Sequence, residues 1–240
     1  MINIPQLSFN NFDFPDTSLA LSEPDGLLCF GGDLSPERLL KAYQQGIFPW
    51  FSPEEPILWW TPSPRTVCMP SQRHISKSLK KASKKVDYTI KWDCAFEEVI
   101  QYCCDLREDN TWISEDIIDA YCELHRLGHA HSVEVWDGDM LIGGLYGLHI
   151  GGVFFGESMF SLQTNASKYA FLGLCQLCET LNIQLIDGQV ENEYLNSLGF
   201  KQIKRSEFEE HLQTLTQQKR EPWPEVFMPV TACFSGYKQK

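Results

Sequence analysis

The fold is decided by a strand–helix–strand stretch that begins with Gly152-Val153-Phe154-Phe155-Gly156-Glu157-Ser158-Met159-Phe160, continues through Asn165-Ala166-Ser167-Lys168 and ends with Leu185-Ile186-Asp187-Gly188-Gln189-Val190. Both flanking runs are apolar enough for strands, and residues 165–181 repeat apolar side chains at helical spacing. In the second run, the two-residue period of a strand predicts that Asp187 and Gln189 point to the same face. Two neighbouring strands would then direct these side chains and Glu157 into one cleft. A carboxylate buried there is costly unless a partner neutralises it or a reaction uses it.

The residues before this stretch predict further strands and helices. Strands are expected over 132–136 and 140–148, because Asp137-Gly138-Asp139 between them is a hairpin signal. Helices are expected over three segments: 76–85, 95–105 and the residues between the N-cap Ser114 and Gly128. Three antiparallel strands, a crossover helix and a further strand make a mixed, mainly antiparallel sheet covered by helices. This order of elements resembles the core of the N-acetyltransferase (GNAT-like) fold.

The first sixty residues are rich in aromatic residues, proline and glycine, and they predict one clear helix. Ser35 is a suitable N-cap, Pro36 suits the first helical position and Gly46 marks the end. A strand over Ile57–Trp60 is broken by Thr61-Pro62-Ser63-Pro64. We therefore expect an α+β chain with a small irregular N-terminal domain, residues 1–62, and a GNAT-like domain, residues 63–240.

Composition limits the class of protein. The 240 residues contain no apolar run long enough to cross a membrane, and the start Met1-Ile2-Asn3-Ile4-Pro5 is not an export signal, so a cytoplasmic protein is expected. Nine cysteines without framework spacing favour reduced thiols. The one CxxC pair, Cys175 and Cys178, lies in an apolar helical stripe and is interpreted as core. No metal, no cofactor and a monomeric state are expected.

The net charge of −12 argues against a broadly basic nucleic-acid binder, but basic residues gather between Arg65 and Lys91. Four of them lie at near-helical spacing along one face, as a helix in contact with phosphates requires: Lys77, Lys81, Lys84 and Lys85. Charge alone does not choose between an RNA contact and a solvated helix face.

The GNAT-like order makes acetyl transfer the first enzymatic hypothesis. Acetyltransferases hold the pyrophosphate of the cofactor on a glycine-containing loop at a helix N-terminus. The corresponding loop here, residues 161–166, contains no glycine, which makes acetyl-CoA a poor candidate for the donor.

A set of motifs extends from residue 15 to about 212: Glu23-Pro24-Asp25-Gly26-Leu27-Leu28, Gly31-Gly32-Asp33-Leu34-Ser35-Pro36-Glu37-Arg38-Leu39, Tyr43, Gly46-Ile47-Phe48-Pro49-Trp50-Phe51, Pro56-Ile57-Leu58-Trp59-Trp60, Pro64-Arg65, Thr111-Trp112-Ile113, Gly128-His129-Ala130-His131-Ser132-Val133-Glu134, Gly156-Glu157-Ser158-Met159-Phe160-Ser161, Asn165-Ala166-Ser167-Lys168 and Leu185-Ile186-Asp187. Together they resemble the leucyl/phenylalanyl-tRNA–protein transferase family. The resemblance implies transfer of Leu or Phe from Leu-tRNA or Phe-tRNA to the N-terminal amine of proteins that begin with Arg or Lys. Such a modification marks the acceptor for degradation.

The resemblance also implies roles for single residues. Asp187 and Gln189 become the catalytic pair: the Gln189 carbonyl accepts a hydrogen bond from the attacking amine, and Asp187 holds and polarises that amide. Without the resemblance, a buried polar pair at a strand end is the competing interpretation. Glu157 would bind the incoming ammonium or the basic side chain of the acceptor, and an intrachain salt bridge is the alternative.

The remaining assignments concern the donor. Trp50 and Trp112 resemble the tryptophans of the family that bind adenosine, whereas isolated tryptophans are otherwise usually core. The pocket for the donor side chain is assigned to Leu145, Phe154, Met159, Phe171 and Leu174, although core packing would give the same pattern. The chain departs from the family at Gly188 and Tyr194, where Cys and His are expected, and in its use of Lys rather than Arg in the basic stretch.

Two other classes of function stay open at this point. One is a GNAT acetyltransferase with a degenerate cofactor loop. The other is a module that binds tRNA or protein N-termini without catalysis.

Overall fold

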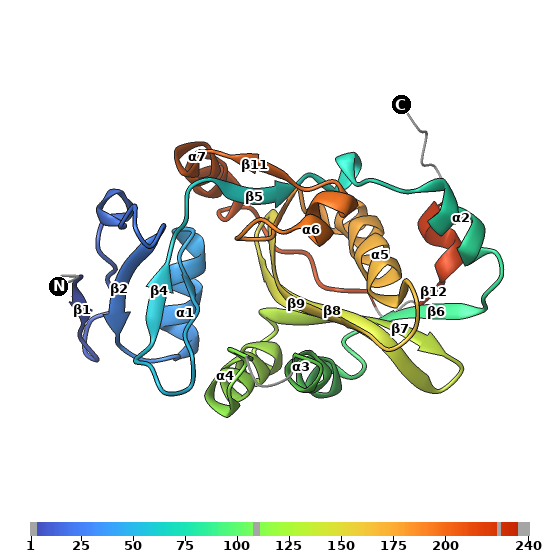
Figure 1. Ribbon diagram of the computed structural model, residues 1–240, viewed down its shortest axis with the longest axis horizontal. Helices are drawn as coiled ribbons and strands as arrows, with labels where there is room; N and C mark the ends of the chain where they lie inside the picture. Colours follow the sequence, from blue (N-terminus) through green and yellow to red (C-terminus); the bar gives the residue numbers. More distant parts are fainter. Residues whose placement is uncertain (1–3, 108–110, 225–226, 235–240) are drawn as a thin grey trace.

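The computed structural model describes residues 4–107, 111–224 and 227–234, and it contains two β-sheets (Figure 1). The smaller sheet lies at one end of the molecule and has the strand order β1-β2-β4-β3. Its elements, with the two helices near it, are β1 (Gln6–Leu7), η1 (Thr17–Leu19), β2 (Leu27–Gly31), α1 (Pro36–Gln44), β3 (Phe48–Pro49) and β4 (Leu58–Trp60). The helix that begins at Pro36 and the strand that ends at Trp60 confirm the prediction for this region.

The larger sheet has eight strands in the order β11-β5-β10-β9-β8-β7-β6-β12. Its strands are β5 (Arg65–Cys68), β6 (Tyr88–Trp92), β7 (Ala130–Asp137), β8 (Met140–Ile150), β9 (Val153–Ser161), β10 (Leu185–Asp187), β11 (Lys201–Ile203) and β12 (Met228–Pro229). Among the described strands of this sheet, β9 and β10 pair in parallel and the other neighbours pair antiparallel. The mixed, mainly antiparallel sheet that the sequence predicts is therefore present.

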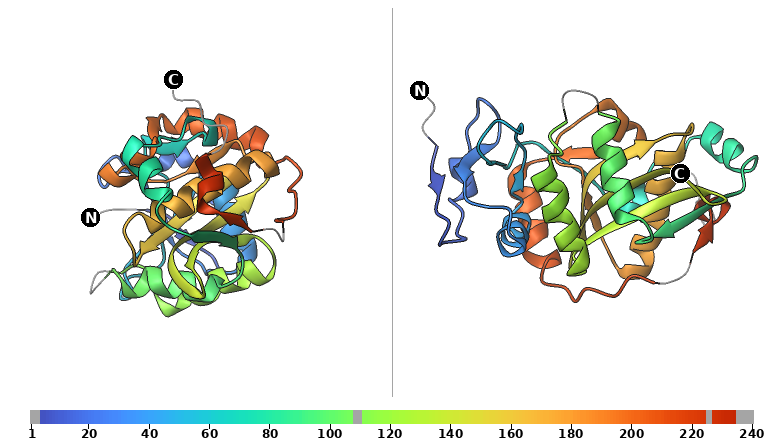
Figure 2. Two further views of the ribbon diagram at one scale, coloured as in Figure 1. Left: turned by 90° about the vertical axis from the view of Figure 1, so that its right-hand side faces the viewer. Right: turned by 90° about the horizontal axis from the view of Figure 1, so that it is seen from below.

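Helices cover both faces of this sheet. They are η2 (Pro70–Gln72), α2 (Lys77–Ser83), α3 (Phe96–Asp105), α4 (Glu115–Arg126), α5 (Ala166–Leu181), α6 (Glu193–Leu198), α7 (Arg205–Leu215) and η4 (Val230–Phe234). Figure 1 places α5 on one face and α3 with α4 on the other, and Figure 2 shows α3 and α4 side by side. An apolar helix that joins two parallel strands of one sheet has to cross over that sheet, which is why α5 packs on one of its faces.

Two apolar clusters fill the space between these layers. One joins the small sheet and α1 to the α3–α4 face of the large sheet, through Tyr43, Tyr121 and Phe155. The other lies under α5 and contains Phe154, Phe171 and the two cysteines of the CxxC pair, which are core residues as expected. Phe154 and Phe155 enter opposite clusters because successive strand residues point to opposite faces.

An irregular pairing between β8 and β9 sets the direction of the Glu157 side chain. The register runs from Gly147–Gly156 to Tyr146–Ser158, so Glu157 is an extra residue without a partner in the ladder. Such a bulge bends the strand and reorients its side chains. Glu157 thereby reaches the tyrosines of α1 and α4 instead of continuing the simple alternation.

The strand predicted over residues 185–190 ends at Asp187, which corrects the sequence-based expectation. Beyond that point the chain leaves the β9 partner, and Gly188 donates its N–H to the carbonyl of Thr66. Gln189 has a left-handed φ of 53°. Asp187 and Gln189 therefore do not share a strand face, because a residue in this conformation does not follow the two-residue period.

The C-terminal segment, which the sequence alone does not place, runs along the large sheet. The Trp223 ring stacks on His131 with centroids 4.1 Å apart, and its Nε1–H donates to His149 Nδ1 at 3.0 Å. Met228 then pairs with Ile90 at the edge of the sheet. None of the described helices is long and apolar enough to span a bilayer. The domain boundary at residue 62 stays a prediction.

Candidate active site

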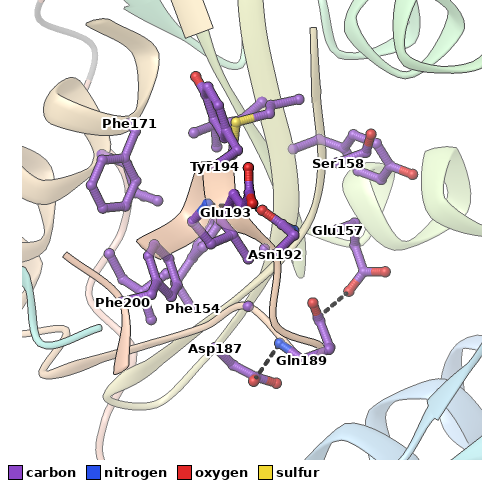
Figure 3. Close-up of a pocket in the computed structure, with 18 of the residues that line it drawn as sticks. Phe154, Glu157, Ser158, Phe171, Asp187, Gln189, Asn192, Glu193, Tyr194 and Phe200 are labelled. Carbon is purple, nitrogen blue, oxygen red and sulfur yellow. Dashed lines mark hydrogen bonds between the residues drawn. The ribbon is translucent and has the colours of Figure 1, made fainter. Parts of the chain in front are cut away.

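A hollow of about 520 Å³ lies between β8, β9 and α5 on one side and the β10–α6 connection on the other. The five side chains predicted to form the donor pocket all line it: Leu145, Phe154, Met159, Phe171 and Leu174. Three apolar residues that the sequence analysis did not select complete the wall: Ile186, Leu195 and Phe200. Figure 3 shows Phe154, Phe171 and Phe200 around this space. A mostly apolar hollow with a few polar groups at one side is typical of a small-ligand site.

A second hollow of about 350 Å³ adjoins the first, and Trp50 and Trp112 line it. The two hollows share five lining residues: Arg107, Glu157, Gly188, Gln189 and Asn192. We call the place where these five residues meet the junction. A ligand with an apolar group and a flat aromatic group can occupy both hollows only if its linking atoms lie at the junction.

The Glu157 carboxylate is held at the junction by two tyrosine hydroxyls. Tyr43 donates to Oε1 at 2.7 Å, and Tyr121 donates to Oε2 at 3.1 Å. The two hydroxyl oxygens also lie within hydrogen-bond distance of each other. Glu157 has no ion pair within the described residues, so the alternative of an intrachain salt bridge is not found there.

This environment perturbs the acid–base behaviour of Glu157. Desolvation raises the pKa of its carboxyl from an ordinary 4.5 to about 7, and the nearby charge of Asp187 acts in the same direction, while the hydrogen bonds from Tyr43 and Tyr121 oppose the rise. A carboxyl with a pKa near neutrality can take up and release a proton at physiological pH.

Asp187 lines the first hollow, but its carboxylate is fully buried in an ion pair. The Arg65 guanidinium binds it through two hydrogen bonds, Nε to Oδ1 at 2.9 Å and Nη2 to Oδ2 at 2.7 Å. Arg65 also donates to the Gly46 carbonyl at 2.9 Å and stacks over Phe48. A two-pronged pair of this kind fixes geometry as well as charge.

Gln189 is tied to both acids, by different atoms. Its backbone N–H donates to Asp187 Oδ1 at 3.0 Å, and its side-chain Nε2 donates to Glu157 Oε1 at 3.4 Å (Figure 3). The expectation that Asp187 polarises the Gln189 side-chain amide is therefore wrong in its contact, because Asp187 binds the backbone. With its nitrogen directed to Glu157, the amide has a carbonyl oxygen that no described residue donates to and that can accept a hydrogen bond.

The two predicted tryptophans are both more exposed than Trp59. Trp50 is 44% exposed and Trp112 is half-buried, as Trp60 is, whereas Trp59 is fully buried in the core. The Trp50 carbonyl accepts a hydrogen bond from Trp60 Nε1 at 2.6 Å, which holds this loop to β4. The Trp50 ring, exposed and fixed by its backbone, is suitable for stacking on a ligand.

The four predicted lysines lie elsewhere. Lys77 and Lys81 are in α2, Lys84 is its C-cap and Lys85 follows, and all four are exposed. Within the described residues none of them forms an ion pair, and Figure 1 places α2 at the opposite end of the molecule from the small sheet. They do not line either hollow of the site.

Sequence reasoning missed several residues that build the junction. Tyr43 belongs to the residues that resemble the family, but it lies 78 positions from Tyr121, and Arg107 follows the C-cap of α3, so no local pattern links them to Glu157. Arg65 belongs to one of the motifs that resemble the family. The expected burial of the Asp187 carboxylate could have indicated that a basic partner is needed. The departures from the family are also explained in part: a Cβ on Gly188 would lie 2.8 Å from a Phe200 ring carbon, and the Tyr194 hydroxyl hydrogen-bonds to Ser167 Oγ at 2.7 Å.

Comparison with known proteins gives a consistent result. The family model described as leucyl/phenylalanyl-tRNA protein transferase matches residues 67–213, and the model for the N-terminal domain of that family matches residues 32–63. A Cellvibrio japonicus protein named leucyl/phenylalanyl-tRNA–protein transferase is 50% identical over 228 residues, which is 93% of this chain and 97% of that protein. A Yersinia enterocolitica protein with the same name is 49% identical over 239 residues, 99% of this chain and 100% of that protein.

Among solved structures, a Bacteroides thetaiotaomicron protein of unknown function is similar to this chain with a TM-score of 0.40 and 11% identity, covering 55% of this chain and 53% of that one. A likeness of this size supports neither a fold assignment nor a function.

Proposed function

The chain belongs to the leucyl/phenylalanyl-tRNA–protein transferase family, and from this premise we propose that it moves Leu or Phe from charged tRNA to the N-terminal amine of proteins that begin with Arg or Lys. It is an aminoacyltransferase. The observation that best supports this assignment of donor and acceptor is the junction, where an apolar hollow and a tryptophan-lined hollow meet at Glu157 and Gln189.

The donor end of the tRNA fits the two hollows. The leucyl or phenylalanyl side chain occupies the apolar hollow, where Met159 and Phe171 line a space large enough for either group. The terminal adenine stacks on Trp50 or Trp112, an interaction worth about 1–3 kcal/mol per base. The ester that joins the amino acid to the ribose then lies at the junction.

The acceptor amine reacts at the same place. An α-amino group has a pKa of about 7.7–8.0 and is partly neutral near pH 7, and an aminoacyl ester is already an activated acyl group. The carbonyl oxygen of Gln189 accepts a hydrogen bond from this amine and orients its lone pair, as the sequence analysis proposes. Glu157, whose pKa lies at about 7, takes the proton that the nitrogen loses during attack. Holding the two reactants together contributes further, up to about 7–11 kcal/mol in well-oriented cases.

Asp187 acts on the reaction through Gln189. Its carboxylate accepts the Gln189 N–H and thereby holds a left-handed backbone conformation, which costs an ordinary residue about 1–2 kcal/mol. Arg65 neutralises Asp187, so this acid does not serve as the base. In our proposal Asp187 is a positioning residue, and Gln189 and Glu157 contact the substrate.

The proposal also covers the contact with the tRNA body, the domain organisation, the oligomeric state and the cellular location. The exposed lysines 77, 81, 84 and 85 contact tRNA phosphates at a distance from the junction. The parallel β9–α5–β10 unit supports a GNAT-like domain over residues 63–240, and the separate small sheet supports an N-terminal domain over residues 1–62. We propose a monomer that acts in the cytoplasm, where charged tRNA is available, and that marks its products for degradation.

The test is incorporation of labelled phenylalanine from Phe-tRNA into a peptide with N-terminal Arg. The proposal expects a product with Phe joined to the N-terminal amine, and no product from the same peptide with an acetylated N-terminus. A peptide with N-terminal Ala measures the preference for basic acceptors. Absence of labelled product from the Arg peptide, with a folded enzyme and intact Phe-tRNA, would contradict the proposed function.

A further inference from the structure

The junction contains one cation, and the function as proposed so far does not use it. Among the described residues that line either hollow, Arg107 is the only Lys or Arg, and it lines both. The acids that line the two hollows are Glu157, Asp187, Glu191 and Glu193. A single guanidinium near four acids is expected to form an ion pair with one of them. If it does not, its position at the junction needs another physical explanation.

Arg107 is fixed at the junction rather than paired. It follows the C-cap of α3, and its backbone N–H donates to the Cys104 carbonyl at 3.2 Å. Its Nη2 donates to the buried Ser158 hydroxyl at 2.8 Å, next to Glu157 on β9. Within the described residues its guanidinium forms no other hydrogen bond and no ion pair, so four of its five N–H donors are without a protein partner there.

A second polar group of a residue that lines the first hollow also lacks a partner among the described residues. Tyr146 lies opposite Ser158 in the β8–β9 ladder and lines the first hollow. Its side chain is fully buried, and its hydroxyl has no hydrogen-bond partner among the described residues. Leaving a buried hydroxyl unsatisfied costs about 1–3 kcal/mol, so an oxygen atom supplied by a ligand would recover this energy.

We propose that Arg107, with the Tyr146 hydroxyl as a second donor, stabilises the negative charge that the carbonyl oxygen of the aminoacyl ester acquires during transfer. The inference rests on the proposed function. It assigns a catalytic role to Arg107, since the guanidinium would touch a reacting atom. Preorganised donors directed at a developing oxyanion are among the largest contributions to acyl-transfer catalysis.

The step balances as follows. The nitrogen of the acceptor amine attacks the ester carbonyl carbon, a C–N bond forms and the π electron pair of the C=O moves to the oxygen, which Arg107 and Tyr146 then hold. Glu157 takes one proton from the nitrogen. When the C=O re-forms, the bond between the carbonyl carbon and the ribose oxygen breaks, and that oxygen receives the proton from Glu157. The products are an amide and a tRNA with a free terminal hydroxyl.

Arg107 could instead bind a phosphate of the tRNA, and the two roles have different kinetic consequences. A phosphate contact acts equally in the bound donor and in the transition state, so its loss weakens binding and leaves the rate of the bound complex unchanged. An oxyanion contact acts only during transfer, so its loss lowers the rate of the bound complex and leaves donor affinity unchanged.

The experiment compares the wild-type enzyme with Arg107→Met, Arg107→Lys and Tyr146→Phe, and uses Arg126→Met, an exposed arginine of α4, as the matched control. Two quantities are measured: the single-turnover rate at saturating Phe-tRNA and Arg-peptide, and the Kd for Phe-tRNA at two salt concentrations. We expect Arg107→Met to lower the rate about 100- to 1,000-fold. Its Kd should stay within about twofold of wild type, because the lost contact forms only in the transition state. Arg107→Lys should retain more activity than Arg107→Met, and Tyr146→Phe should lose rate with unchanged Kd.

Three results would overturn the inference while leaving the proposed function intact. One is a weakened Kd and a reduced salt dependence for Arg107→Met with an unchanged saturated rate, which identifies a phosphate contact. Another is wild-type behaviour of Arg107→Met. The third is a loss of rate that follows a loss of thermal stability in each variant, with equal loss in Arg107→Lys. A wild-type enzyme that transfers no phenylalanine would contradict the proposed function itself.

Discussion

The Glu157 carboxyl lines both hollows, and desolvation raises its pKa to about 7. If it accepts the proton of the attacking amine, the transfer rate must rise with pH through that value, because only the ionised carboxylate is a base. We predict that Glu157→Gln lowers the rate by about 10²- to 10⁴-fold, the usual contribution of a general base, and removes the part of the rising limb that Glu157 controls, so that only the titration of the peptide amine remains. Single-turnover transfer to one peptide between pH 5.5 and 8.5 measures both effects.

Tyr121→Phe is the control for this assignment. The hydrogen bond from Tyr121 favours the ionised form of Glu157, so its loss should move the midpoint of the rising limb to higher pH. The titration of the peptide amine is the same for both enzymes and does not affect the comparison. A midpoint that is identical in wild type, Tyr121→Phe and Glu157→Gln would show that another group titrates.

The buried pair of Arg65 and Asp187 should stabilise the fold only when both partners are present. Both side chains are fully buried, so removal of one partner leaves an uncompensated charge. We predict that Arg65→Met or Asp187→Asn lowers the free energy of unfolding by about 3–5 kcal/mol, and that the double variant Arg65→Met/Asp187→Leu recovers part of this loss. Urea denaturation measures these changes. An Asp187→Asn enzyme with wild-type stability and no turnover would point to direct catalysis by Asp187 instead.

At single residues, the sequence predicted which side chains meet and erred in how they meet. Glu157 and Gln189 lie at one junction as expected, and the five predicted pocket residues line one hollow. The contact between Asp187 and the Gln189 backbone was not predictable from period-2 alternation, since β10 ends at Asp187 and Gln189 has a left-handed φ. Alternation also cannot reveal the bulge that turns Glu157 towards Tyr43.

The connection between β10 and α6 depends on a small residue at position 188. A Cβ there would lie 2.8 Å from a ring carbon of Phe200 and 3.0 Å from a methyl carbon of Leu195. These two side chains of the first hollow therefore pack directly against the glycine and leave no room for a methyl group. We predict that Gly188→Ala costs about 1–3 kcal/mol of stability through overpacking. Because the two positions are in contact, adding Phe200→Leu should restore part of the loss, and the coupling energy should exceed about 0.5 kcal/mol in a double-mutant cycle.

Thermal or urea unfolding of the two single variants and the double variant gives this coupling. Strict additivity of the two substitutions would contradict the packing argument. The same cycle, read out by transfer from Leu-tRNA and Phe-tRNA, reports how far this contact sets the size of the donor hollow.

At the scale of whole elements, the sequence predicted the helices and the hairpin whose stabilising residues lie close together in the chain. The predicted helix over 95–105 is α3 (Phe96–Asp105), and Ser114 caps α4 through a hydrogen bond to the Ile117 N–H. β12 was not predictable, because it has two residues and exists only through pairing with β6. Short strands held by distant partners leave no periodic pattern in the sequence.

On the scale of the molecule, our proposal assigns the tRNA phosphates to the four lysines and the acyl end of the donor to the junction. We predict that replacing Lys77, Lys81, Lys84 and Lys85 together by Gln weakens Phe-tRNA binding and reduces its salt slope by up to about 1 per lysine. Affinity for a phenylalanyl-adenosine analogue, which has no tRNA phosphates, should not change. Equal affinity of the variant and the wild type for Phe-tRNA at low salt would assign these lysines to a solvated helix face.

The site as a whole is assembled from segments far apart in the chain. Trp50 belongs to the loop after β3, Trp112 precedes α4, and the acids come from β9 and β10. Sequence motifs along nearly the whole chain indicated the family, and the family indicated these residues. Only the three-dimensional arrangement reveals that two hollows meet at Arg107, Glu157 and Gln189.

The central claim is that the junction holds the acyl linkage of the donor, and a crystal structure with a phenylalanyl-adenosine analogue whose ester is replaced by an amide tests it most directly. The account predicts the phenyl ring among Phe154, Met159 and Phe171, the adenine in contact with Trp50 or Trp112, and the linking carbonyl at the junction beside Arg107 and Gln189. Density for the analogue outside both hollows, or a linkage that lies away from Arg107, Glu157 and Gln189, would contradict it.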